Sequence, residues 1–112
     1  MTLDQMKGRT KTVTRRQGWR FLKPGMVLNV VDRVMGLKRG EHPRKIGQIR
    51  ITAVWREFLN QITDADVVRE GFPTWNRRRF IEEFCRRFRC EPWEEVTRIE
   101  FEHLVGDELE EY

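Results

Sequence analysis

A lysine and a threonine three residues apart are the first pair in this sequence that could do chemistry together. Lys11 and Thr14 lie in the stretch TKTVTRRQGW, residues 10–19. A threonine hydroxyl is a weak nucleophile unless an adjacent base or an amine of lowered pKa activates it. Nearby cations would lower the pKa of Lys11 if the stretch is partly desolvated, and four arginines flank it: Arg9, Arg15, Arg16 and Arg20. A continuous strand points Lys11 and Thr14 to opposite faces, so joint action needs a bend or a helical turn.

Glu70 is the acidic group that would complete such a site. The segment ITDADVVREGF predicts a helix that begins at Thr63 and ends before Gly71, with Asp64 and Asp66 in its first turn. Glu70 would then lie at the negative end of the helix dipole, which raises the pKa of a carboxylic acid. A raised pKa suits general acid/base catalysis. The residues alone favour the simpler alternative, a surface glutamate beside a helix cap.

The same basic stretch contains candidates for binding a nucleic acid or a nucleotide. Arg15 and Arg16 have no acidic neighbour in the local sequence and are candidate phosphate ligands. Thr12 and Thr14 are candidates for hydrogen bonds to a base or a sugar. Trp19 lies beside an arginine, an arrangement that base stacking uses, although a structural role is equally open.

Two further segments add candidates of the same kind. Trp75 lies at the expected start of a helix and is open to the same two interpretations as the first tryptophan. The loop GLKRGEHPRK, residues 36–45, carries Lys38 and Arg39, which either contact a phosphate or remain solvated. Trp55, by contrast, falls on the inward face of an expected strand and is assigned to the core.

The arginine-rich segment RRRFIEEFCRRFR, residues 77–89, looks like a nucleic-acid patch but has a simpler explanation. In a helix its charges form i,i+4 pairs, namely Arg78 with Glu82, Arg79 with Glu83, Glu82 with Arg86 and Glu83 with Arg87. This pattern favours a self-compensated solvent face. Cys85 lies on the apolar stripe of that helix, as buried cysteines commonly do. Because Cys90 is the only other cysteine and the chain has two histidines, no metal site, cofactor or disulfide framework is expected.

Hydrophobic periodicity predicts the elements that must position these residues. A short helix over residues 2–8 delivers the opening stretch, which itself forms a short strand. Alternation predicts further strands over residues 26–35, 47–59 and 96–104. A helical period predicts a second main helix after Thr74.

This order of elements indicates an α+β fold or a small, partly open β-barrel. Strands that are mostly antiparallel, with two helices inserted before the last strand, are typical of both. Within the strands, alternation places Ile49, Ile51 and Trp55 on an inward face and Arg98 on an outward one.

The length and the charge of the chain limit the class of protein to which it can belong. The chain has 112 residues, which indicates one domain over residues 1–105 followed by an acidic tail over residues 106–112. The net charge of +4 hides a basic first quarter and an acidic end from Glu94 onward. This split favours a basic face that meets phosphates and a solvated tail. No apolar run is long enough to cross a bilayer, so a cytoplasmic protein without a membrane partner is expected.

Several segments in a fixed order give the sequence a family likeness. The most diagnostic pieces are Lys11-Thr12-x-Thr14-Arg15, Pro24-Gly25 and Glu70-Gly71-Phe72. With the surrounding segments, over residues 3 to 101, they resemble the ASCH domain, a family of the PUA-like superfamily of small β-barrels. The segment MGLKRGE is most similar to small ASCH proteins of actinobacteria and their phages, which implies the host cytoplasm for a phage-encoded protein.

The resemblance implies a barrel with a cleft beside the Lys-Thr motif, a cleft proposed to bind RNA or nucleobases. One bacterial branch is similar to amidohydrolases that remove acyl groups from N4-acylcytidine. Carried over by motif, Lys11 would activate the hydroxyl, Thr14 would be the nucleophile and Glu70 would be the acid/base residue. A related branch is described as ribonucleases, so the family does not fix the reaction.

The expected function is therefore binding of RNA, a nucleotide or a nucleobase in a basic cleft lined by the Lys-Thr-x-Thr-Arg-Arg motif, residues 11–16. An enzyme, either an N4-acylcytidine amidohydrolase or a ribonuclease, is the first alternative. A phage accessory domain that binds a protein partner through the acidic tail is the second.

Overall fold

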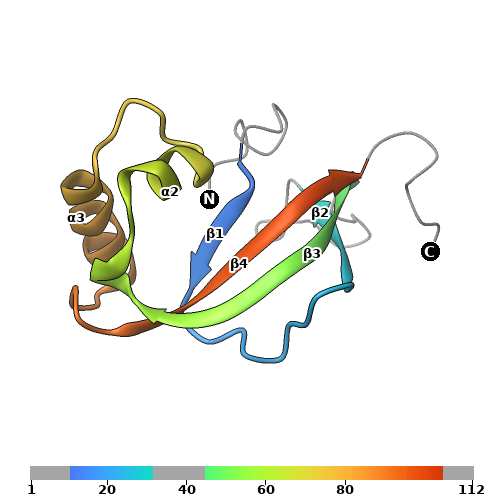
Figure 1. Cartoon of the computed structure of the whole chain (residues 1–112), viewed down its shortest axis with the longest axis horizontal. Coiled ribbons are helices and arrows are strands. Elements are labelled where there is room, and N and C mark those ends of the chain that lie inside the picture. Colours follow the sequence, from blue (N-terminus) through green and yellow to red (C-terminus); the bar gives the residue numbers. More distant parts are fainter. Residues whose placement is uncertain (1–10, 32–44, 105–112) are drawn as a thin grey trace, which may run out of the picture.

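Two long antiparallel strands, β3 (Lys45–Phe58) and β4 (Glu95–Leu104), form the frame of the fold. In the computed structural model they make one curved ribbon (Figure 1). The short strand β1 (Val13–Arg16) pairs with β4, and β2 (Val27–Val31) pairs with β3. The four antiparallel strands therefore take the order β1-β4-β3-β2, with β1 and β2 at the edges of the described sheet.

The chain between β3 and β4 forms a 3-10 turn, η1 (Leu59–Gln61), and two helices that lie over one end of the ribbon (Figure 1). The first helix, α2 (Asp64–Arg69), begins where the sequence predicts, because the Thr63 hydroxyl accepts a hydrogen bond from the backbone N–H of Asp66. Gly71 follows the helix with a φ of 99°, a conformation that glycine adopts most readily. Both predicted ends of α2 are confirmed.

The second helix, α3 (Arg77–Phe88), starts two residues later than predicted. Its N-cap is Asn76, whose side chain accepts a hydrogen bond from the backbone N–H of Arg79. Asparagine is among the best residues for this position. The predicted apolar stripe is confirmed, with three buried residues, Phe80, Ile81 and Phe84, and two half-buried ones, Cys85 and Phe88.

Buried apolar side chains form two clusters. The first joins the helices to the sheet and consists of Leu59, Ile62, Val67, Phe80, Ile81, Phe84, Cys90 and Val96. The second lies on the strands and consists of Leu22, Ile49, Ile51, Ile99 and Phe101. Met26, Leu28 and Val30 pack against the second cluster, as their alternation predicts.

A β-bulge reverses the predicted alternation in the second half of β3. The register with β4 shifts between Ile51 and Ala53, which leaves Thr52 as an extra residue. Beyond the bulge Val54 packs against the second cluster, whereas Trp55 is 46% exposed. The assignment of Trp55 to the core is therefore wrong, because one extra residue moves every later side chain to the other face.

The described elements make an α+β fold, as predicted. The structure describes residues 11–31 and 45–104. None of the helices in these ranges combines the length and apolar character needed to cross a membrane. Three predicted features lie outside them: the helix over residues 2–8, the loop that carries Lys38 and Arg39, and the acidic tail over residues 106–112.

Candidate functional site

The lysine of the basic stretch and the glutamate that follows α2 form a buried ion pair. Lys11 Nζ lies 2.7 Å from Glu70 Oε1 and also donates to the backbone carbonyl oxygen of Glu70 at 2.9 Å. Burial lowers the pKa of Lys11; Glu70 opposes this change, and the charges of Arg16 and Arg15 add to it. The direction agrees with the sequence prediction, but burial is a larger cause than the neighbouring arginines.

Backbone contacts bring these two residues together. The Thr12 N–H donates to the carbonyl oxygen of Arg69 at 2.8 Å, so the chain that enters β1 is joined to the last residue of α2. Glu70 is the C-cap of that helix, where carbonyl groups lack an intrahelical partner. The Lys11 ammonium supplies the missing donor. Thr12 also accepts a backbone hydrogen bond from Phe101 at 2.9 Å, so its main chain helps to build the site.

Arg15 is buried at the centre of a second set of ion pairs. Its guanidinium contacts three carboxylates, with N–O distances of 2.8 Å to Glu57, 2.6 Å to Asp66 and 3.1 Å to Glu70. Only 1% of the residue is exposed. The side chain is therefore committed to protein partners rather than presented to a phosphate. Because Glu70 contacts both Lys11 and Arg15, two cations hold its carboxylate in place.

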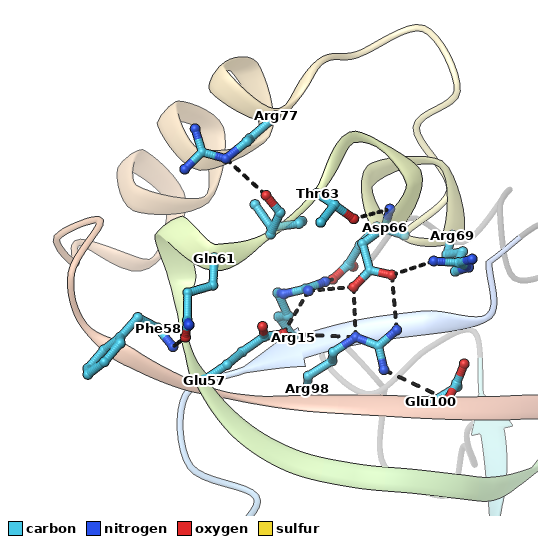
Figure 2. A network of polar contacts seen from close by, with 12 residues as sticks. Arg15, Glu57, Phe58, Gln61, Thr63, Asp66, Arg69, Arg77, Arg98 and Glu100 are labelled. Carbon is cyan, nitrogen blue, oxygen red and sulfur yellow. Dashed lines mark hydrogen bonds and ion pairs between the residues drawn. The ribbon is translucent and has the colours of Figure 1, made fainter.

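Asp66 links this set of ion pairs to β4 (Figure 2). Arg98 Nε lies 2.7 Å from Asp66 Oδ2 and Arg98 Nη2 lies 2.9 Å from Oδ1, while Arg69 contacts Oδ1 at 3.0 Å. Burial raises the pKa of Asp66, but hydrogen bonds from Arg98, Arg15 and Arg69 outweigh it and hold that pKa well below its usual range. The prediction that Arg98 points outward is wrong, because Asp66 draws it into a buried pair.

A cavity of about 410 Å³ lies between β1 and α3. Its apolar wall consists of aromatic rings, namely Phe72, Trp75, Phe80, Phe84 and Phe88. Its polar lining consists of Thr14, Arg15, Arg16, Glu70, Glu83, Arg86 and Arg87. A concave, mostly apolar space with a few polar groups is typical of a small-molecule site, and such sites measure about 300–1,000 Å³.

Thr14 lines this cavity and has an unsatisfied hydroxyl. Its Oγ1 is buried and has no hydrogen-bond partner within the described part of the chain. A buried polar atom without a partner costs roughly 1–3 kcal/mol, so such an atom needs an explanation. Thr14 and Glu70 both line the cavity, whereas Lys11 touches Glu70 from outside the lining. Glu70 is thus common to the ion pair and the cavity, while Thr14 Oγ1 forms no hydrogen bond with Lys11 or Glu70.

The two candidate stacking tryptophans have different surroundings. Trp75 lines the cavity, stacks on Phe72 with ring centroids 4.1 Å apart, and has the Arg79 guanidinium 4.5 Å from its ring centroid. Trp19 is 43% exposed, lies outside the cavity lining and has the Arg16 guanidinium 5.8 Å from its ring. Only Trp75 is placed to contact a molecule in the cavity.

Several residues of the site are missed by reasoning from the sequence. Alternation and capping rules place Glu57, Asp66 and Arg98 without giving them a role. One signal does exist, since Asp66 in the first turn of α2 and Glu70 at its C-cap are four residues apart and so lie on the same side of the helix. Phe72 directly follows the Glu70-Gly71 pair, yet only the fold places its ring in the cavity wall.

The two cysteines have the properties of packed side chains. Both are free thiols, and their Sγ atoms lie 4.0 Å apart. Burial raises the pKa of Cys85 and raises that of Cys90 to about 11. A raised pKa lowers the thiolate fraction, which makes a poor nucleophile. Within residues 11–31 and 45–104, moreover, no three His, Cys, Asp or Glu side chains are grouped to hold a metal ion.

Comparison with known proteins identifies a structural relative. No family model matches the sequence, and no curated protein matches it significantly. The chain is similar to the crystal structure of protein EF3133 from Enterococcus faecalis V583, of the family DUF984, with a TM-score of 0.60 and 18% sequence identity. The match covers 91% of this chain and 66% of that protein, so this chain spans just under two thirds of its length. At this identity the likeness shows the fold.

Proposed function

We propose that the protein is an ASCH-type, PUA-like domain that binds the base of an RNA, a nucleotide or a free nucleobase in the cavity between β1 and α3. The observation that carries this proposal is the unpartnered, buried hydroxyl of Thr14 at an aromatic-walled cavity. A base has the matching combination of a flat π face for the rings and polar atoms on its edge. In this proposal the four-stranded sheet is the described part of the small barrel that the family resemblance implies.

The aromatic wall is built to receive a planar ring. The Trp75 ring stacks on Phe72 and contacts the guanidinium of Arg79, so its position needs little reordering when a ligand arrives. Stacking of a base on an aromatic side chain is worth about 1–3 kcal/mol. Both aromatic residues are therefore assigned to the base.

Polar groups at the same cavity are suited to the edge of the base. Thr14 Oγ1 can donate or accept a hydrogen bond, and an ionised Glu70 carboxylate can accept one. The cations Lys11 and Arg15 position that carboxylate before any ligand binds. Arg15 thus takes a positioning role in place of the predicted phosphate contact, while Arg16 lines the cavity and keeps its ligand-binding assignment.

Equilibrium titration tests this function directly. Nucleobases, nucleosides, nucleotides and a short single-stranded RNA are added to the protein, and binding is followed by calorimetry. We expect saturable binding that Trp75→Ala weakens about tenfold or more through lost stacking. Trp93→Ala is the matched control, because Trp93 is 65% exposed and does not line the cavity. No saturable binding across the whole panel would overturn the proposal.

The contact between Lys11 and Glu70 favours a second candidate function, hydrolysis of an acyl amide such as N4-acylcytidine. In this scheme Thr14 Oγ1 attacks the acyl carbonyl carbon and gives its proton to the Lys11–Glu70 pair. The C–N bond then breaks, the pair returns the proton to the leaving amine, and water hydrolyses the acyl ester on Thr14. A neutral amine is the form that accepts a proton; burial favours that form of Lys11 by lowering its pKa, and the ion pair with Glu70 opposes this change.

Product analysis separates the two functions. Incubation with N4-acetylcytidine should release cytidine and acetate if the protein is an amidohydrolase. Thr14→Ala and Glu70→Gln should then reduce turnover by a factor of about 10³ or more, as expected for a nucleophile and its acid/base group. Thr14→Ser keeps a hydroxyl and should keep part of the activity. Base binding with no turnover would reject the enzyme and leave the binding function standing.

A further inference from the structure

The cavity has an excess of positive charge that its own glutamates do not balance. Four arginines and two glutamates line it. The two glutamates are taken up in two ion pairs, Glu70 with Arg15 and Glu83 with Arg86. The remaining cations, Arg16 and Arg87, form no ion pair with any described residue. Two guanidiniums without an ion-pair partner in residues 11–31 and 45–104 thus face one space.

Of these two arginines, Arg16 gives the stronger evidence for an anion site, because it is half-buried. It belongs to β1 and lies two residues after Thr14. Burial lowers the pKa of Arg16, Glu70 raises it, and the nearby charge of Arg87 lowers it again. Glu70 cannot fully balance Arg16, because both of its carboxylate oxygens already accept hydrogen bonds from other cations. A partly desolvated cation beside a second cation is an arrangement that an anion would relieve.

Arg87 reaches the same cavity from the last turn of α3. A cation at this end of a helix is favoured by the helix dipole, which is sufficient to explain Arg87 alone. The dipole does not explain why its charge converges with that of Arg16, which comes from a different element. Arg78, on the same helix, shows the usual alternative: it is paired with Glu82 at 3.1 Å and does not line the cavity.

We propose that Arg16 and Arg87 form an anion subsite that takes the phosphate group of a nucleotide whose base lies against the aromatic wall. The inference rests on the proposed function and narrows its ligand from any base-containing molecule to a phosphorylated one. Guanidinium groups are suited to this task, since each presents a planar set of donors that matches phosphate oxygens. Thr14 and Arg16 lie about 7 Å apart along one strand, so β1 would contact both the base edge and the phosphate.

Paired ligands that differ only in the phosphate test the subsite. Each of the four ribonucleosides is titrated beside its 5′- and 3′-monophosphates, and inorganic phosphate is added as a competitor. We expect at least one monophosphate to bind about tenfold or more tightly than its nucleoside. Arg16→Gln and Arg87→Gln should each remove most of that preference. Arg78→Gln is the matched control and should leave the preference intact.

A short RNA without terminal phosphates distinguishes an internal phosphate of an RNA chain from the phosphate of a free nucleotide. If it binds as tightly as the monophosphate and shows the same dependence on Arg16 and Arg87, the subsite holds an internal phosphate of a chain. If it binds no better than the nucleoside, the subsite holds the phosphate of a free nucleotide. Either result supports the subsite and identifies its natural ligand class.

Failure of the subsite and failure of the proposed function give different results. Equal affinity for a nucleoside and its monophosphates, in all four pairs, overturns the anion subsite but leaves base binding intact. A preference that survives in both glutamine variants, or that Arg78→Gln also removes, overturns the assignment to Arg16 and Arg87. Absence of binding by every nucleoside and nucleotide overturns base binding and the subsite together. Thermal unfolding of each variant confirms that it is folded.

Discussion

Two basic regions of this protein handle their positive charge in different ways. In residues 11–16, Lys11 and Arg15 are buried and paired with carboxylates that are 42 to 59 residues away in the chain. In α3, the arginines that are paired have partners three or four residues away, on an exposed helix face. The first region is part of the interior, and the second is surface.

This difference separates charged groups that stabilise the fold from charged groups that are available to a ligand. A buried ion pair is costly to break, because removal of one partner leaves an uncompensated charge in the interior. An exposed pair contributes little, since solvent and salt screen it. Arg87 belongs to the exposed region and yet lines the cavity, so its charge is available to a ligand. The contrast between the two regions therefore predicts where substitutions affect stability and where they affect binding.

The largest effect is expected for Arg15→Met. The substitution leaves Glu57, Asp66 and Glu70 without a shared cation, and loss of one partner from a buried set costs about 3–5 kcal/mol. Denaturant unfolding monitored by circular dichroism measures the change. Arg78→Met, whose side chain is 86% exposed, should change the unfolding free energy by less than about 0.5 kcal/mol. Similar values for the two variants would contradict the division into buried and exposed charge.

A second, smaller effect is expected for Asp66→Asn. The asparagine keeps the shape of the side chain but loses charged hydrogen bonds to Arg98, Arg15 and Arg69, at a cost of about 2–3 kcal/mol at pH 7. The folded-state pKa of Asp66 is depressed, so its contribution is present above the unfolded-state pKa of about 4 and is lost as pH falls below it. The wild-type unfolding free energy should therefore fall more steeply below pH 4 than that of Asp66→Asn. Parallel pH profiles would show that Asp66 does not carry this stability.

The two regions also show how far the sequence predicts the fold and the site. Local rules suffice for the Thr63 cap, for the end of α2 before Gly71 and for the apolar stripe of α3. They fail at Thr52, because a bulge depends on the partner strand and not on the segment that contains it.

The pairing of the charged residues follows local rules only in part. The basic stretch has no acidic neighbour in the sequence, yet Arg15 is the best-paired cation of the site. Of the i,i+4 pairs predicted in α3, Arg78 with Glu82 is present, but Arg86 contacts Glu83 at i,i+3 and Arg79 lies over the Trp75 ring. Pairing across tens of residues requires the fold. No local rule predicts the contact between Lys11 and Glu70: the residues suggest Glu70 only as a possible acidic complement, and the family resemblance implies that the two act together.

Thr14→Val is expected to separate stability from function. Valine has nearly the shape of threonine and removes a buried hydroxyl that lacks a partner among the described residues, so the unfolding free energy should stay within about 1 kcal/mol of wild type or rise. The affinity for a base, and any turnover of N4-acetylcytidine, should fall about tenfold or more. Thermal unfolding and titration of the same sample measure both quantities. Clear destabilisation would show that the hydroxyl has a partner in the free protein and would weaken its assignment to a ligand.

The smallest effect is expected for an ion pair on the exposed face of α3. It tests whether exposed pairs contribute as little to stability as the comparison of the two regions predicts. Arg78 and Glu82 form an i,i+4 pair whose side chains are 86% and 65% exposed, so a double-mutant cycle with alanine at both positions should give a coupling energy of about 0.3–0.5 kcal/mol. This coupling should disappear in about 1 M salt, where the screening length is about 3 Å. The destabilisation caused by Arg15→Met should persist in the same salt, because solvent ions do not reach its buried partners. The division would be contradicted if the Arg78–Glu82 coupling energy resisted salt and were as large as the destabilisation caused by Arg15→Met. Burial would then not distinguish the two regions, and the argument that the Arg87 charge is available to a phosphate would fail.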